Sequence, residues 1–157
     1  MPRKILDLAH FIKESNAIEC ILREPTLEEM NAHTELLQKG GLSVRDMEEF
    51  VSIIQPDAHL RINAGDNVRI GDYFPPPGDI TIKTRLEDIL KDAYEARMRC
   101  DHKAIHLLHH RYESLHPFMD GNGRSGRALW LWCHDGYAPL GFLHQWYYDT
   151  LKWGRYE

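Results

Sequence analysis

The sequence is poor in cysteine and has no long apolar run. Its 157 residues include three cysteines, Cys20, Cys100 and Cys133, which are far apart and form no Cys-x-x-Cys pair. Neither a disulfide framework nor a zinc knuckle is therefore indicated. No apolar run reaches the roughly 18 residues of a membrane span, and the N-terminus lacks a signal-peptide core. We therefore expect a cytoplasmic protein without membrane association.

The sequence also lacks a cluster of basic residues. Its formal net charge is −5; residues 1–80 carry 8 Lys and Arg against 14 Asp and Glu, and residues 81–157 carry 11 against 10. Binding to a polynucleotide depends on neutralising many phosphates with basic side chains. The charge distribution therefore argues against a nucleic acid partner, although a local pair of arginines is sufficient for a single nucleotide.

The hydrophobic pattern predicts a single, mainly α domain over residues 1–157. With 43% hydrophobic residues, a chain of this length can form one core, and no repeat or linker divides it. The expected helices span residues 3–23 (one bent helix or two short ones), 26–38, 43–56, 82–94, 102–112 and 123–133, with a final helix after them. Residues 58–78 instead carry short alternating segments and the run Pro75-Pro76-Pro77-Gly78, which indicate a small hairpin or an ordered loop.

The most informative run is residues 116–127, His-Pro-Phe-Met-Asp-Gly-Asn-Gly-Arg-Ser-Gly-Arg. His116 can take a proton near neutral pH, and Asp120 offers hard oxygen ligands to Mg²⁺. Gly121 and Gly123 let backbone N–H groups approach an anion. Arg124 and Arg127 each supply a planar guanidinium group that can donate two parallel hydrogen bonds to a phosphate. A helix beginning near Gly123 would add the positive end of its dipole. The run therefore predicts an active site that handles phosphate.

This run resembles the signature of Fic-domain proteins, His-x-Phe-x-(Asp/Glu)-Gly-Asn-(Gly/Lys)-x-x-x-Arg, and fills every signature position. The resemblance implies a Fic-type helical domain with a small β-hairpin flap at 58–78 and a catalytic helix-loop-helix at 102–133. It also implies a protein adenylyltransferase. Such an enzyme transfers AMP from ATP, with Mg²⁺, to a Ser, Thr or Tyr hydroxyl of a target protein.

The resemblance further implies a role for each signature residue. His116 would be the general base and Asp120 the Mg²⁺ ligand. The nucleotide phosphates would be held by Gly121, Asn122, Gly123, Arg124 and Arg127. Arg124 would lie at the β-phosphate and Arg127 at the γ-phosphate. Glycine at position 123 favours nucleotidyl transfer, because relatives that transfer a terminal phosphate tend to carry lysine there.

Residues 15–20, Ser-Asn-Ala-Ile-Glu-Cys, resemble the inhibitory motif of the same family, (Ser/Thr)-x-x-x-Glu-(Gly/Asn). The motif lies in the N-terminal segment 1–24 and assigns the inhibitory role to Ser15 and Glu19. Glu19 would accept hydrogen bonds from Arg127, so that ATP binds only in an unproductive pose. Cys20 departs from the usual Gly or Asn, and a solvated Glu19 without a partner is the alternative.

Two other regions resemble binding elements of the family. Val68, Ile70 and Tyr73 would clamp the backbone of an extended target segment by strand addition; an ordinary hairpin packed on the core is the alternative. Tyr147 and Tyr148 resemble a Tyr-Tyr-x-x-Leu helix that walls the adenine pocket, and packing in the core explains them equally well.

Two other functions stay open at this point. One is a Fic-type enzyme that uses another nucleotide donor, or that removes AMP with Glu19 orienting a water. The other is a non-catalytic helical interaction module. The sequence does not identify the target protein, for which the chain itself is one candidate, and it leaves self-association as a homo-oligomer open.

Overall fold

The computed structural model describes residues 7–136, and this part of the chain is mainly α-helical, as predicted. Its helices are α1 Leu8–Ile18, α2 Leu27–Leu37, α3 Val44–Ile54, α4 Thr81–Met98, α5 His102–Leu115 and α6 Asn122–Cys133. A capping box at Thr26 begins α2, and a second one at Ser43 begins α3. None of these helices is long and apolar enough to cross a membrane.

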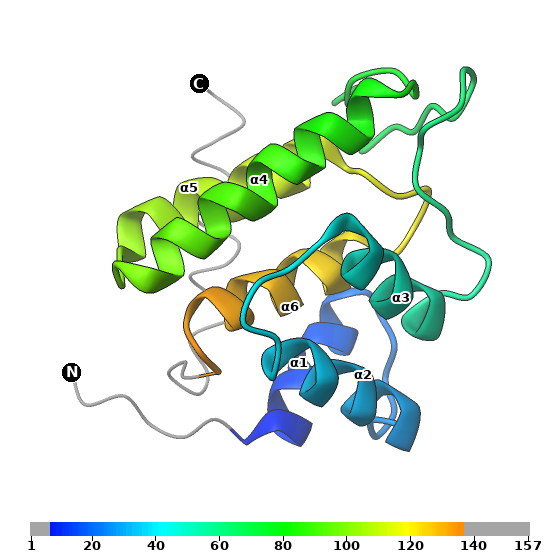
Figure 1. Ribbon diagram of the computed structural model, residues 1–157. Coiled ribbons are helices and arrows are strands. Elements are labelled where there is room, and N and C mark those ends of the chain that lie inside the picture. Colours follow the sequence, from blue (N-terminus) through cyan, green and yellow to red (C-terminus); the bar gives the residue numbers. More distant parts are fainter. Residues whose placement is uncertain (1–6, 137–157) are drawn as a thin grey trace.

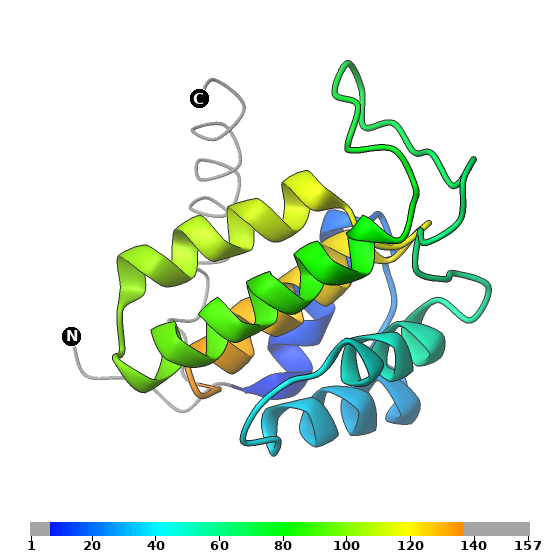
Figure 2. The ribbon, with the colours of Figure 1, turned by 45° about the horizontal axis from the view of Figure 1, so that its top comes forward.

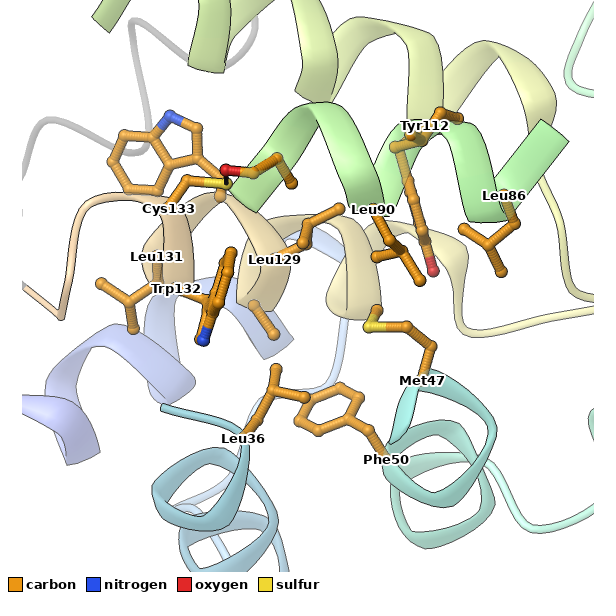
Figure 3. Packing of buried hydrophobic residues seen from close by; sticks show 14 of the residues in the cluster. Leu36, Met47, Phe50, Leu86, Leu90, Tyr112, Leu129, Leu131, Trp132 and Cys133 are labelled. Carbon is orange, nitrogen blue, oxygen red and sulfur yellow. Dashed lines mark hydrogen bonds between the residues drawn. The ribbon is translucent and has the colours of Figure 1, made fainter. Parts of the chain in front are cut away.

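Helix α6 lies at the centre of the fold. It packs against each of the other helices in the described part of the chain, with α4 and α5 on one side and α1, α2 and α3 on the other (Figure 1). Every residue from 128 to 133 is buried, as expected for a helix segment that is apolar on all sides. Figure 3 shows side chains of α6 meeting those of α2, α3, α4 and α5. The polar N-terminal half of α6 is thereby held in a fixed place.

The β-hairpin predicted within residues 58–78 does not form in the described structure. The segment is an ordered loop with one isolated bridge, in which Ile70 and Tyr73 exchange two backbone hydrogen bonds of 2.9 Å. The next hydrogen-bonded pair outward would join Val68 to Pro75, and proline has no N–H to donate. The ladder therefore stops after one pair. Figure 2 shows the loop beside the end of α5.

Candidate active site

The loop between α5 and α6 brings His116 next to the start of α6. His116 ends α5 with φ 51° and ψ 63°, a left-handed conformation that is uncommon for a residue other than glycine. Gly121, with φ 79°, precedes the first turn of α6. Phe118 between them is 1% exposed and anchors the loop in the core. The tight reversal places the predicted base and the N-terminal end of α6 in one site.

Asn122 and Arg124, both expected at the phosphates, have protein partners in this structure. The Asn122 amide accepts a hydrogen bond from the Phe118 N–H (2.9 Å) and donates one to the Phe118 carbonyl (2.8 Å), and this pair closes the loop. Arg124 donates to the carbonyl of Ile54 (3.0 Å) and to Gln55 Oε1 (2.8 Å) at the end of α3. Direct contacts of these side chains with phosphate therefore remain predictions.

Arg127 points instead at α1. Its Nε donates to Ser15 Oγ (2.7 Å), and its Nη2 donates to the Ser15 carbonyl (3.0 Å) and to Glu19 Oε1 (2.8 Å). Arg127 is 1% exposed, whereas the Glu19 side chain is 40% exposed. Glu19 thus meets Arg127, as the family resemblance implied, and Ser15 adds two contacts that the sequence did not predict.

Gly123 makes room for the Glu19 carboxylate. A Cβ at position 123 would overlap with Glu19 Oε1 and would lie 3.1 Å from Arg127 Nη1. The carboxylate therefore lies against the first turn of α6, where backbone N–H groups without intrahelical partners and the positive dipole end favour an anion. Glu19 thus lies beside Gly123 and Arg127, two of the residues that the family resemblance assigns to the nucleotide phosphates.

The surroundings of His116 keep its imidazole neutral. Burial lowers the pKa of His116 below the usual 6.5, and the cationic Arg61 acts in the same direction, against the Glu113 backbone and the negative charges of Asp120 and Glu19, which raise it. A histidine with a lowered pKa is unprotonated at pH 7 and can accept a proton. This electrostatic state suits the role of general base.

Arg61 was missed by the sequence analysis. Its side chain is fully buried, and its Nε donates a 2.6 Å hydrogen bond to the carbonyl of His116. The only sequence signal is a charged residue within a short alternating segment, between Leu60 and Ile62. Such a residue is ordinarily expected on the solvent side, so sequence alone gives no reason to place it at the site.

Asp120 is exposed in the loop, and its Oδ1 accepts a hydrogen bond from the Gly121 N–H (2.8 Å). Among residues 7–136, no group of three or more His, Cys, Asp or Glu side chains is arranged to hold a metal ion. Mg²⁺ is commonly bound by one or two carboxylates together with waters and the phosphates of a substrate. A single carboxylate beside an anion site fits this mode of binding.

The predicted target-docking residues lie in the loop that contains the Ile70–Tyr73 bridge. Val68 and Ile70 are half-buried, and the Tyr73 hydroxyl donates to the Ser114 carbonyl (2.8 Å). Tyr73 therefore fastens the loop to α5, two residues before His116. Tyr147 and Tyr148, expected at the adenine pocket, lie outside the described residues.

Comparison with known proteins agrees with this geometry. Over 133 residues the chain is 32% identical to "Protein adenylyltransferase Fic" of Drosophila willistoni and 35% identical to the Drosophila virilis protein of the same name. The alignments cover 76% of this chain but only 26% and 27% of those proteins, so the chain spans about a quarter of their length. The sequence model of the Fic/DOC family matches residues 25–133, from just before α2 to the end of α6. The chain therefore belongs to the Fic/DOC family.

Proposed function

We propose that this protein is an adenylyltransferase that transfers AMP from ATP to a Ser, Thr or Tyr hydroxyl of a target protein. The observation that carries the proposal is the meeting of a neutral His116, the start of α6 and the buried Arg127 in one site. The names of the relatives support the same chemistry.

The geometry suggests how the transfer proceeds. His116 takes the proton of the target hydroxyl, the hydroxyl oxygen forms a bond to the α-phosphorus of ATP, and the bond from that phosphorus to the bridging oxygen breaks. Pyrophosphate leaves with the electron pair. A positioned base of this kind accelerates a reaction by about 10²- to 10⁴-fold. Asp120 would hold Mg²⁺, which neutralises charge on the phosphates when it is bound.

The proposal includes a resting state in which Glu19 blocks the site. Its carboxylate lies on Arg127 and against Gly123, so a γ-phosphate cannot use the same guanidinium. The segment Ser15–Glu19 is then an inhibitory element. The alternative of an unpartnered, solvated Glu19 does not fit a 2.8 Å contact with a buried arginine.

The test compares the parent protein with Glu19→Gly, each incubated with Mg²⁺ and either α-labelled or γ-labelled ATP, alone and with a cell lysate. We expect the α label on protein, more strongly in Glu19→Gly, and no label after an added His116→Ala change that leaves ATP binding intact. Transfer of the γ label would instead show phosphorylation. Removal of AMP from a labelled protein would favour the reverse activity, and no transfer from either label would favour a binding module.

A further inference from the structure

Arg61 has surroundings that its place in the sequence does not explain. The side chain is fully buried, and all the hydrogen bonds of its guanidinium found in the described structure go to backbone carbonyls. They run from Nε to His116 (2.6 Å), from Nη1 to Asp66 (3.0 Å) and Pro76 (2.9 Å), and from Nη2 to Leu115 (2.8 Å). Burying a cation is costly unless hydrogen bonds compensate for the lost water. The cost of burying Arg61 therefore indicates that its four hydrogen bonds to carbonyls have a role in the structure or the function of the protein.

Two of these carbonyls belong to the end of α5. The last carbonyls of a helix have no intrahelical partner and carry the negative end of its dipole, so a cation there stabilises the end. At this end His116 adopts a left-handed conformation, which costs energy for a residue with a side chain. Arg61 thus holds the one residue of the helix end whose orientation the proposed chemistry requires.

The other two carbonyls belong to the loop that carries Val68, Ile70 and Tyr73. Backbone pairing between the Arg61 N–H and the Pro117 carbonyl (2.9 Å), and between the Met119 N–H and the His59 carbonyl (2.9 Å), joins the same segments. One planar guanidinium therefore fixes the target-docking loop and the base relative to each other. The three donors of a lysine cannot reproduce this arrangement, because the five N–H groups of arginine point in fixed directions from a plane.

We propose that Arg61 is a positioning residue that holds His116 in line with the hydroxyl presented by the docking loop. This inference rests on the proposed function. Arg61 touches no reacting atom, so its replacement should lower the rate of transfer at saturating ATP and leave the affinity for ATP unchanged. A role confined to stabilising the fold would lower the free energy of unfolding without changing the rate of the protein that remains folded.

The test uses Glu19→Gly as the starting protein and adds Arg61→Lys or Arg61→Gln. A matched control is Arg97→Lys, since Arg97 also donates to a backbone carbonyl, that of Lys39 (3.1 Å), and lies at the opposite end of α4 from the docking loop. We expect the initial rate of α-label transfer to fall on the order of 10²-fold in both Arg61 variants, as misplacement by about 1 Å does. The ATP concentration for half-maximal rate should stay the same, and Arg97→Lys should keep the full rate.

Amide hydrogen exchange gives a second readout that does not depend on activity. Loss of the Arg61 hydrogen bonds should speed exchange in the peptides covering residues 112–121 and 64–78 and leave α3 unchanged. If the Arg61 variants do not fold, hydrogen exchange of the Arg61 side-chain Nε–H can be measured in the unmodified protein instead. We expect this exchange to be slow, because the Nε–H is bonded to the His116 carbonyl. An unchanged rate in a folded Arg61 variant, unchanged exchange in both peptides, or a fast-exchanging Nε–H would overturn the proposal.

The two proposals can fail separately. If Glu19→Gly transfers no label at all, the proposed function is wrong, and hydrogen exchange alone then decides whether Arg61 positions the loop. If Glu19→Gly transfers label and the Arg61 variants do so equally well, the function stands and the role of Arg61 is wrong.

Discussion

Glu19 Oε1 and Arg127 Nη2 lie 2.8 Å apart, although 108 positions separate the two residues in the sequence. The arginine is buried and also donates to the side chain and the carbonyl of Ser15. Removing the Glu19 carboxylate therefore leaves the guanidinium with two hydrogen bonds to Ser15. The pair can thus be broken by mutation without leaving an isolated buried charge, the costly case for a buried pair.

The first prediction concerns the strength of this inhibitory contact. A hydrogen bond to a charged group contributes about 1.5–3 kcal/mol, and about 1.4 kcal/mol corresponds to a factor of ten. Glu19→Gly should therefore raise the initial rate of α-label transfer by roughly 10- to 100-fold over the parent, measured at equal ATP and Mg²⁺. Glu49→Gln is the control, because it removes an exposed carboxylate that pairs with Arg45 on α3 (3.2 Å), away from α1. An equal rise in both variants would attribute the effect to net charge.

The second prediction concerns pH. His116 acts as a base only when it is neutral, and its pKa is lowered by burial and by Arg61, so protonation requires more acid than usual. The rate of the Glu19→Gly variant should therefore be level between about pH 7 and 8 and fall only below about pH 6.5, the ordinary value. The Glu19→Gly change itself lowers the pKa of His116 further, because the negative charge of Glu19 raises that pKa in the parent protein. A rate that still climbs tenfold from pH 7 to 8 would contradict a neutral base.

The sequence allowed most of the helices to be predicted, because they depend on local patterns, although the helical region expected to reach residue 23 ends at Ile18. The capping boxes at Thr26 and Ser43 form from residues three positions apart, and the pairing of Glu19 with Arg127 followed from a family resemblance. The hairpin was predicted wrongly because alternation at Leu60, Ile62, Val68 and Ile70 does not reveal which N–H groups the prolines remove from the ladder.

The partners of Arg61, Asn122 and Arg124 could not be predicted from sequence. Each of these side chains bonds to groups whose position depends on how the chain folds back in space: Arg61 to the end of α5, Asn122 to Phe118, and Arg124 to the end of α3. Residue type alone places an arginine or asparagine in solvent. The packed structure shows that Arg61 and Asn122 hold the loop between α5 and α6, and that Arg124 joins α6 to the end of α3.

The third prediction concerns Glu29, which fastens α1 to α2. It is 4% exposed, and its carboxylate accepts hydrogen bonds from Asn16 Nδ2 (2.8 Å), Arg23 Nη1 (2.5 Å) and the Thr26 N–H (2.9 Å). Burial alone would raise the pKa of Glu29, but these hydrogen bonds outweigh it and lower the pKa from 4.5 to about 2. The ionised Glu29 carboxylate therefore stabilises the folded state above about pH 4.5, and this contribution to the free energy of unfolding is lost as the pH falls toward 2.

Glu29→Gln should therefore lower the free energy of unfolding at pH 7 by up to about 3 kcal/mol. The difference from the parent should shrink as the pH falls from 5 to 2, as urea titrations at several pH values can measure. A constant difference across this range would show that the charge of Glu29 does not matter. Because α1 carries Ser15 and Glu19 directly follows it, Asn16→Ala should also raise α-label transfer, less than Glu19→Gly does.

The fourth prediction compares two cysteines that end helices in the same way. Cys20, which follows α1, and Cys100, which follows α4, both adopt the left-handed backbone conformation, with φ of 61° and 52°. At each helix end two backbone hydrogen bonds run back to carbonyls of the last turn. After α1 the Ile21 N–H donates to the Asn16 carbonyl and the Cys20 N–H to the Ala17 carbonyl. After α4 the Asp101 N–H donates to the Ala96 carbonyl and the Cys100 N–H to the Arg97 carbonyl. This is the position where glycine is favoured, because a Cβ costs about 1 kcal/mol in the left-handed region.

Cys20→Gly and Cys100→Gly should each raise the free energy of unfolding by about 1 kcal/mol, as measured by urea titration. Only Cys20→Gly should lower the basal rate of α-label transfer, because a firmer end to α1 keeps Glu19 on Arg127 for more of the time. Cys100→Gly stabilises a helix that carries no part of the inhibitory contact, so its rate should equal that of the parent. If both variants lowered the rate equally, the effect would come from global stability, and the end of α1 would have no special part in restraining the site.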